Sequence, residues 1–189
     1  MNARFATAML LTVGVVSTAQ GQTPVTPHQD AATQSHWGER SAGGVKLDTA
    51  TFISQATQGG LTEVAVSTAV AAKTQDPKVR QFAQQMVRDH GKANDELRRL
   101  ATARGLQVPT SLDAEHQASV QTLSRLEGAE LDAAYGTQMK EDHARTVALF
   151  EAATKLSDSD LAAFARKYLA TLRQHQHLAG DLPGAVHTG

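Results

Sequence analysis

A pattern of five residues occurs twice in the chain and is the strongest candidate for chemistry. Residues 86–90 read Met-Val-Arg-Asp-His and residues 139–143 read Met-Lys-Glu-Asp-His, so both copies follow Met-x-x-Asp-His. Because a Met and a His four positions apart lie on one face of a helix, each copy presents both groups together. Were the two helices to pack side by side, two imidazoles, two thioethers and two carboxylates would converge. The repeat therefore predicts either a transition-metal site or a polar seam that fixes helix register.

Two further polar side chains lie on apolar helix faces and are candidates for the same centre. His175 continues an apolar line through Leu161 and Leu172, and Glu63 flanks a stripe beside Val66. A polar group on such a face needs a partner if it is buried. One imidazole from each of three helices, with a carboxylate from the fourth, would suit Zn, Cu, Fe or Mn. The predicted metal ligands are Glu63, His90, His143 and His175.

The Asp and Met residues of the repeat form a second tier of candidates. Asp89 and Asp142 each lie about 100° around the helix from the neighbouring His, so they reach a shared centre only at its edge. Otherwise each could orient a His on an adjacent helix. Met86 and Met139 would bias a metal site toward copper, because thioether sulfur is a soft ligand. In the structural alternative, each His donates to a carboxylate or carbonyl and Met fills the core.

Several kinds of chemistry are excluded by the residue types. Dinuclear iron bundles use Glu-x-x-His, but Val87 and Lys140 stand where the glutamates would be required. The chain has no cysteine, which removes thiolate sites and disulfides. The sequence contains no phosphate-binding glycine loop, no nucleophile elbow and no His-Glu-x-x-His helix, which leaves the question of an enzyme open but favours a non-enzymatic protein. A formal net charge of −1 argues against a nucleic-acid partner.

The elements that must position these residues are helices. Apolar residues recur every three to four positions, and no segment has the two-residue period of a strand. The pair Gly59-Gly60 is expected to interrupt the first helix. This pattern predicts an all-α, ferritin-like four-helix bundle with one short additional helix. The predicted helix boundaries are Asp48, Asp76-Pro77, Gly105, Ser111–Asp113, Gly128 and Asp158.

The chain divides into four predicted segments. Residues 1–19 carry Arg4, an apolar core and small residues before a cleavage site, as a secretory signal peptide does. Residues 20–46 are rich in Gln, Thr, Ser, Gly and Pro and predict a flexible linker. The bundle is expected over 47–180 and a disordered tail over 181–189. With no later run that could span a bilayer, we expect a periplasmic or otherwise exported protein without a transmembrane span.

A short internal similarity supports two related helical hairpins. Residues 76–83 (Asp-Pro-Lys-Val-Arg-Gln-Phe-Ala) resemble residues 158–165 (Asp-Ser-Asp-Leu-Ala-Ala-Phe-Ala), and each run opens the second helix of a pair. Two hairpins related by a pseudo-twofold axis are how ferritin-like bundles are built.

Two stretches of the chain resemble the bacterial family called domain of unknown function 4142. The first contains Gly59-Gly60-Leu61-x-Glu63, Asp76-Pro77 and Met86-x-x-Asp89-His90, and the second contains Met139-x-x-Asp142-His143, Phe164-Ala165 and Thr171-Leu172-x-x-His175. The resemblance covers residues 48–180. It implies a ferritin-like bundle exported to the cell envelope, often labelled an outer membrane protein, and it implies no activity. The family's characteristic positions fall on Glu63, Asp89, His90, Asp142, His143 and His175.

Three functional hypotheses remain open at this level. We favour a non-enzymatic binding or structural module of the cell envelope, related to stress, because no catalytic spacing is recognisable. The alternative is a transition-metal-binding or redox protein that uses the His/Asp/Glu cluster to hold Cu, Zn or Fe. A third hypothesis has the short helix around His116 mediate a homo-oligomer or a contact with an envelope partner. The first requires no cofactor, and the second requires a transition metal.

Overall fold

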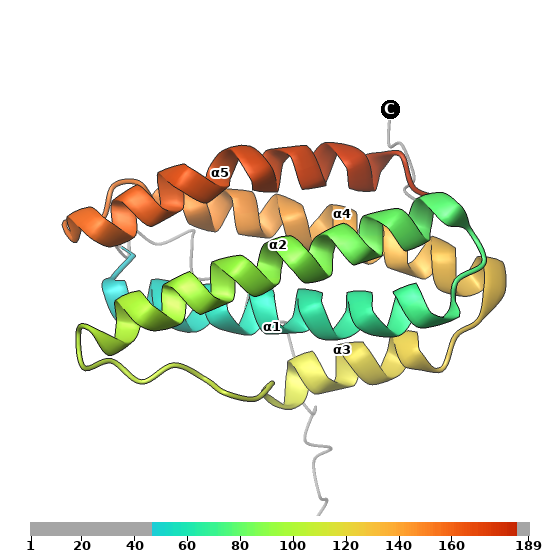
Figure 1. Ribbon diagram of the computed structural model, residues 1–189, viewed down its shortest axis with the longest axis horizontal. Coiled ribbons are helices and arrows are strands. Elements are labelled where there is room, and N and C mark those ends of the chain that lie inside the picture. Colours follow the sequence, from blue (N-terminus) through green and yellow to red (C-terminus); the bar gives the residue numbers. More distant parts are fainter. Residues whose placement is uncertain (1–46, 185–189) are drawn as a thin grey trace, which may run out of the picture. The chain divides into compact units, whose positions relative to one another are not determined.

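The computed structural model of the protein describes residues 47–184 and confirms the all-α prediction. These residues form five helices and no strand (Figure 1). None of the five helices is both long and apolar enough to cross a membrane. The predicted signal peptide, the predicted linker and residues 185–189 lie outside the described part of the chain. The helices are α1 (Thr49–Lys73), α2 (Pro77–Thr102), α3 (Ala114–Ser124), α4 (Gly128–Ala153) and α5 (Ser159–Gly180).

Aspartate side chains start four of the helices at the predicted places. The carboxylates of Asp48, Asp76, Asp113 and Asp158 accept hydrogen bonds from backbone N–H groups in the first turns of α1, α2, α3 and α5. Such caps satisfy amides that have no partner inside the helix. The start of α4 is different, because Glu127 makes no side-chain cap and Gly128 adopts a positive φ of 56°.

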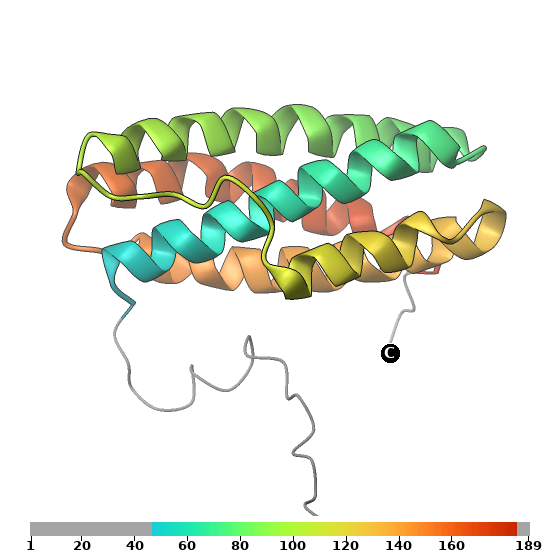
Figure 2. The ribbon, with the colours of Figure 1, turned by 90° about the horizontal axis from the view of Figure 1, so that it is seen from below.

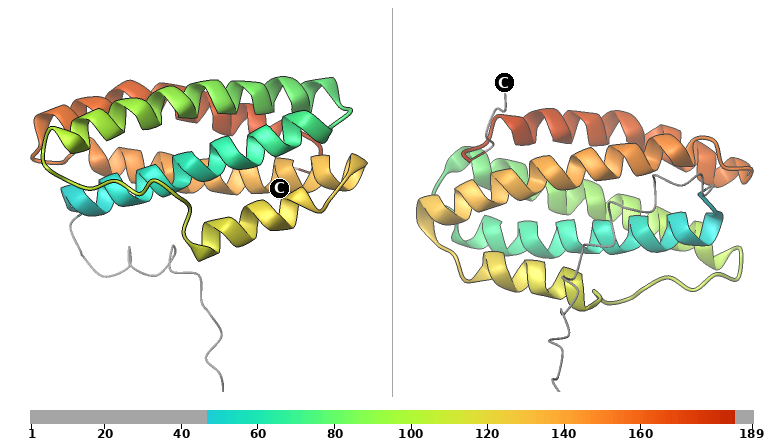
Figure 3. Two further views of the ribbon diagram at one scale, coloured as in Figure 1. Left: turned by 60° about the horizontal axis from the view of Figure 1, so that its bottom comes forward. Right: turned by 180° about the vertical axis from the view of Figure 1, so that it is seen from behind.

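The four long helices form two antiparallel hairpins, α1–α2 and α4–α5, joined by a crossover. The loop after α2 and the helix α3 run back along the bundle, so that α4 starts at the end where α2 starts (Figures 1 and 2). Both α2 and α4 pack against α1 and α5 and lie diagonally across the bundle from each other (Figure 3). The two copies of Met-x-x-Asp-His are therefore on diagonal, parallel helices and not side by side. One long crossover is typical of ferritin-like bundles.

The crossover also sets the level of the two copies along the bundle. Met86 follows the start of α2 by nine residues and Met139 follows the start of α4 by eleven. A difference of two residues corresponds to only about 3 Å of helix rise. Because the two helices run in the same direction from the same end, the two copies face each other across the core.

Two apolar clusters fill the bundle, one on each side of this level. The first cluster includes Val66, Phe82, Met86, Leu131, Tyr135, Met139 and Ala179. The second cluster includes Phe52, Leu97, Val147, Phe150, Phe164 and Leu172. On α2, α4 and α5, the residues of the two clusters lie on opposite sides of His90, His143 and His175. The three histidines thus form a polar layer between two apolar layers.

The prediction that Gly59-Gly60 interrupts the first helix is wrong. Helix α1 continues through both glycines. Gly60 is buried where the Asn94 side chain of α2 packs against it, and a Cβ there would lie 2.0 Å from Asn94 Oδ1. Each glycine destabilises a helix by about 1 kcal/mol relative to alanine, but the packing of this long helix outweighs that cost. The glycine lets α1 and α2 approach closely.

Residues 181–184, which we predicted as part of a disordered tail, pack as a turn against α4. Leu182 is buried, and the Thr137 hydroxyl donates to the Gly184 carbonyl at 2.8 Å. Gly136 makes this contact possible, because a Cβ at that position would lie 2.2 Å from the Pro183 carbonyl oxygen.

Helical glycines with and without free space at the Cβ position predict opposite effects on stability. Gly59→Ala should raise the free energy of unfolding by about 0.5–1 kcal/mol, because a Cβ there meets nothing within 4 Å. Gly136→Ala should lower it by about 1–3 kcal/mol, since the new methyl displaces the turn at Pro183. Urea denaturation of both variants measures the effects. A Gly136→Ala variant at least as stable as wild type would contradict the packing described for Gly136.

Candidate metal centre

The structure brings together the three histidines that the apolar stripes predicted. His90 of α2, His143 of α4 and His175 of α5 are all buried in the bundle core. Their ring centroids form a nearly equilateral triangle with sides of 5.5, 5.5 and 5.4 Å. One ring nitrogen from each lies within 4.8 Å of the others. Three helices therefore converge on one small volume with an imidazole each.

The spacing of these nitrogens matches what one metal ion requires for one pair and comes within about 1 Å of it for the widest pair. With Zn–N bonds of about 2.0–2.1 Å, two nitrogens on one ion lie about 3.3–3.6 Å apart in tetrahedral or trigonal geometry. The Nε2 atoms of His90 and His143 are 3.4 Å apart. The widest of the three separations, at no more than 4.8 Å, needs to close by about 1 Å.

Hydrogen bonds fix which ring nitrogen of His143 and of His175 carries the lone pair, and on His143 that nitrogen accepts from His90 Nε2–H at 3.4 Å. The Nδ1–H group of His143 donates to the Met139 carbonyl at 2.9 Å, which leaves Nε2 as the acceptor nitrogen. The Nε2–H group of His175 donates to Asp89 Oδ2 at 3.0 Å, which leaves Nδ1. That Nδ1 atom is buried and has no hydrogen-bond partner. A histidine that ligates a metal is typically held by its other ring nitrogen in this way.

Burial keeps the three imidazoles in the neutral form that a metal needs. Desolvation lowers the pKa of His90 well below its ordinary value, and the neighbouring imidazoles lower it further. Desolvation lowers the pKa of His143 to about 4, although the Met139 carbonyl opposes the shift. The pKa of His175 is also lowered by burial, against the opposing effect of Asp89. At neutral pH each ring has a lone pair to donate.

Glu63, the predicted fourth ligand, lies next to the triangle and not at its centre. Its Oε1 atom is 3.8 Å from His143 Nδ1, the ring nitrogen that already donates to Met139. Its Oε2 atom is buried without a partner. Desolvation raises the pKa of this carboxyl well above its ordinary value, and the Asp142 charge adds to the rise. Direct ligation by Glu63 stays a prediction.

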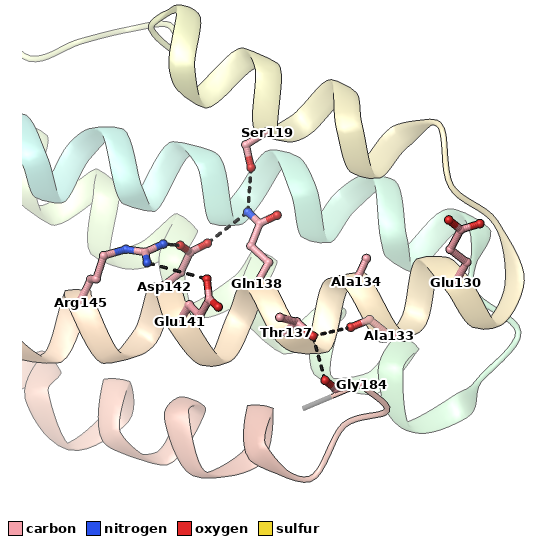
Figure 4. A pocket seen from close by; sticks show the side chains of 10 residues that line it. All are labelled: Ser119, Glu130, Ala133, Ala134, Thr137, Gln138, Glu141, Asp142, Arg145 and Gly184. Carbon is pink, nitrogen blue, oxygen red and sulfur yellow. Dashed lines mark hydrogen bonds and ion pairs between the residues drawn. The ribbon is translucent and has the colours of Figure 1, made fainter. Parts of the chain in front are cut away.

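The two aspartates of the repeat make different contacts. Asp89, with 28% of its side chain exposed, bonds His175 on the adjacent helix, which is the orienting contact we predicted as one alternative. Asp142 instead accepts from Gln138 Nε2 at 3.1 Å and pairs with Arg145. It lines an open groove of about 670 Å³ along α4, to which Ser119 of α3 and Gly184 also contribute. Figure 4 shows these side chains. None of the three clustered histidines lines this groove.

The two methionines of the repeat lie in the first apolar cluster. Met86 and Met139 are both fully buried, one turn before His90 and His143. The Phe82 ring of the same cluster lies 6.4 Å from the rings of His143 and His175, between centroids. A part for either sulfur in copper ligation stays a prediction.

Two other histidines lie away from the cluster, and two buried polar pairs, Ser67–Tyr135 and Thr74–Asp132, were missed. His177 is exposed, while half-buried His116 pairs with Asp113 at 2.7 Å. The hydroxyls of Ser67 and Tyr135 form a buried hydrogen bond of 2.8 Å. Tyr135 lies four residues before Met139 on the buried face of α4, and the rule that a buried tyrosine hydroxyl finds a partner could have prompted a search for Ser67 on α1.

The buried histidines predict a loss of stability in mild acid for metal-free protein. Between pH 6.5 and about 4, the unfolded chain takes up a proton at His143 and the folded chain does not. The free energy of unfolding therefore falls as the pH falls through this window. His143→Gln should remove up to about 3 kcal/mol of that fall, at about 1.4 kcal/mol per pKa unit. Urea denaturation with chelator at pH 7, 5.5 and 4.5 measures it, with His177→Gln as the exposed control. An unchanged pH dependence in His143→Gln would contradict the neutral, buried ring.

Comparisons with known proteins place the chain in a family. The bundle is similar to the crystal structure of a DUF305 fragment from Deinococcus radiodurans, with a TM-score of 0.63 and 16% sequence identity. The match covers 70% of this chain and 92% of that one, and at this identity it shows the fold alone. A search of curated proteins finds no match. The family model described as "Domain of unknown function (DUF4142)" matches residues 34–182, and the chain therefore belongs to the DUF4142 family.

Proposed function

We propose that the protein binds one transition-metal ion inside the bundle, with His90, His143 and His175 as ligands. The observation that carries the proposal is the convergence of one buried imidazole from each of three helices, with nitrogens within 4.8 Å of one another. This was the alternative hypothesis from the sequence, and the geometry now favours it over a purely structural module.

The state of the polar groups supports a ligand at this position. A buried polar atom without a hydrogen bond costs about 1–3 kcal/mol, so a folded protein rarely keeps one without a reason. His175 Nδ1 and Glu63 Oε2 are both in this condition, and both belong to the polar layer. A cation bound to the three imidazoles would use the His175 lone pair.

The donor set indicates the class of metal. Three neutral nitrogen donors without cysteine suit Zn, Cu, Fe or Ni, and disfavour Mg and Ca, which prefer oxygen. The two nearest carboxyl groups are Glu63 and Asp89, which flank His143 and His175 from outside the triangle. The Asp89 carboxylate, which accepts from His175, can offset part of the charge of a bound cation without binding it directly.

We infer a binding function and not catalysis. An enzymatic metal keeps an open position that substrate can reach. The three histidines are between 0% and 6% exposed, and the groove beside Asp142 is lined by other residues.

We further propose that the protein acts in the periplasm or cell envelope, on the grounds of the signal-like residues 1–19. Export with cleavage after residue 19 is tested by N-terminal sequencing of the mature protein from a periplasmic extract.

Metal binding should appear as stoichiometric uptake and as added stability. Wild-type protein made without a His tag should hold about one equivalent of Zn or Cu by elemental analysis, because the cluster offers a single site. At a free metal concentration of 100 times Kd, the ion should stabilise the fold by about 2.7 kcal/mol. The double variant His90→Ala/His143→Ala should bind none and should show no rise in unfolding temperature with metal.

A matched pair on α5 separates ligation from general effects of histidine loss. His175→Gln should weaken metal binding more than the 10–100-fold typical of losing an outer-shell partner. His177→Gln makes the same chemical change two residues further on at an exposed site, and should leave affinity unchanged. Metal-free wild type whose unfolding temperature ignores Zn, Cu, Fe and Mn would contradict the proposal. It would support a polar layer that serves only to fix helix register.

A further inference from the structure

We propose a division of tasks between the two copies of Met-x-x-Asp-His, in which only the aspartate of the first copy serves the metal site. Asp89 is then a positioning residue for His175, which lies outside both copies. In this arrangement His90 and His143 offer Nε2 to the metal, whereas Asp89 turns His175 so that it offers Nδ1. The inference rests on the proposed function and specifies how that site coordinates its ion.

The contacts of His175 carry the assignment. Its Nε2 atom lies 3.0 Å from Asp89 Oδ2, and a carboxylate can only accept, so the ring proton is on Nε2. The remaining nitrogen, Nδ1, is buried without a partner in a side chain that is 1% exposed. It is the one position of this ring with a lone pair to give.

His143 has the opposite arrangement for a local reason. Its Nδ1–H group donates to the carbonyl of Met139, one turn back on the same helix. The ring proton is therefore on Nδ1, and Nε2 faces His90 Nε2 at 3.4 Å. The backbone of α4 holds the Nδ1 side of this imidazole, and the hydrogen bonds of Asp142 go to Gln138 and Arg145 instead.

The direction of the helices explains why His175 depends on another helix. Side chains on a helix tilt toward its N-terminus. Helix α5 runs opposite to α2 and α4 (Figure 1), so by this rule the His175 side chain tilts along the bundle in the opposite direction to His90 and His143. Its outward nitrogen then meets α2, where Asp89 stands beside His90. Asp142, at the same place in the second copy, faces the groove and bonds Gln138 and Arg145 (Figure 4).

Nitrogen-15 NMR of histidine-labelled wild type tests the assignment directly. In metal-free protein near pH 7, His175 should be the Nε2–H tautomer and His143 the Nδ1–H tautomer. On titration with Zn(II), a diamagnetic probe, the largest nitrogen shifts should fall on His175 Nδ1 and on Nε2 of His90 and His143. A metal-free Nδ1–H tautomer at His175 would overturn the inference.

The repeat itself provides the matched variants. Asp89→Asn should weaken Zn(II) binding about 10–100-fold, as loss of an outer-shell carboxylate typically does. Asp142→Asn changes the same residue type at the same place in the other copy, and should alter affinity by less than about threefold, within the scatter expected of a residue that contacts no ligand. Equal weakening by the two variants would overturn the division of tasks.

These outcomes separate this inference from the proposed function. If wild type takes up no metal, the proposed function and this coordination mode both fail. If wild type binds Zn(II) and the tautomers or the two Asn variants behave otherwise than stated, the metal site stands and only the part of Asp89 is wrong. The tautomer measurement uses the wild-type chain, so the inference stays testable even if Asp89→Asn does not fold.

Discussion

The cost of holding three imidazoles in a dry bundle core governs the middle of this structure. Each ring carries two nitrogens that lose their water on folding, and an unpaired buried nitrogen costs about 1–3 kcal/mol. The protein meets this cost by two different means, a backbone carbonyl for His143 and a carboxylate for His175. Charging any of the rings would cost more still, which is why burial lowers the pKa of all three. Neutral rings, each with one nitrogen that carries a lone pair, are the common result.

The topology supplies what the polar layer needs. If a short loop joined the two hairpins, α4 would start where α2 ends and would run antiparallel to it. The crossover through α3 returns the chain to the other end, so that His90 and His143 reach the core at one level from diagonal helices. Apolar clusters on both sides then exclude water and hold the four helices together. The same packing that stabilises the bundle makes the imidazoles neutral.

Much of the fold and part of the site could be predicted from the sequence, for reasons that are local. Asp76 and Asp158 cap the first turns of their own helices, and His90 is a polar residue on the apolar stripe of its own helix. Both kinds of prediction can be made without knowing what the neighbouring helices are. What could not be predicted depends on neighbours in space. Gly60 was expected to break α1 because glycine disfavours a helix. It does not, since the Asn94 side chain of α2 packs against it, and that contact cannot be read from the sequence of α1. Glu63 was ranked with the histidines, yet its position beside His143 Nδ1 follows from ring orientation, which no spacing reveals.

Two repeats in the sequence have different structural meanings. The similarity between the residues that follow Asp76 and those that follow Asp158 relates α2 to α5, the second helices of the two hairpins. Met-x-x-Asp-His relates α2 to α4, which a duplication of hairpins does not pair. The common pattern therefore reflects a common environment, since both helices run in parallel on the diagonal and both present a buried face at the same level. The two environments are not identical, and the aspartates show the difference. Asp89 of α2 points toward α5 and meets His175. Asp142 of α4 faces the groove near α3. One pattern thus brings two histidines into one cluster but gives its two aspartates different partners, because each helix has a different neighbour on that side.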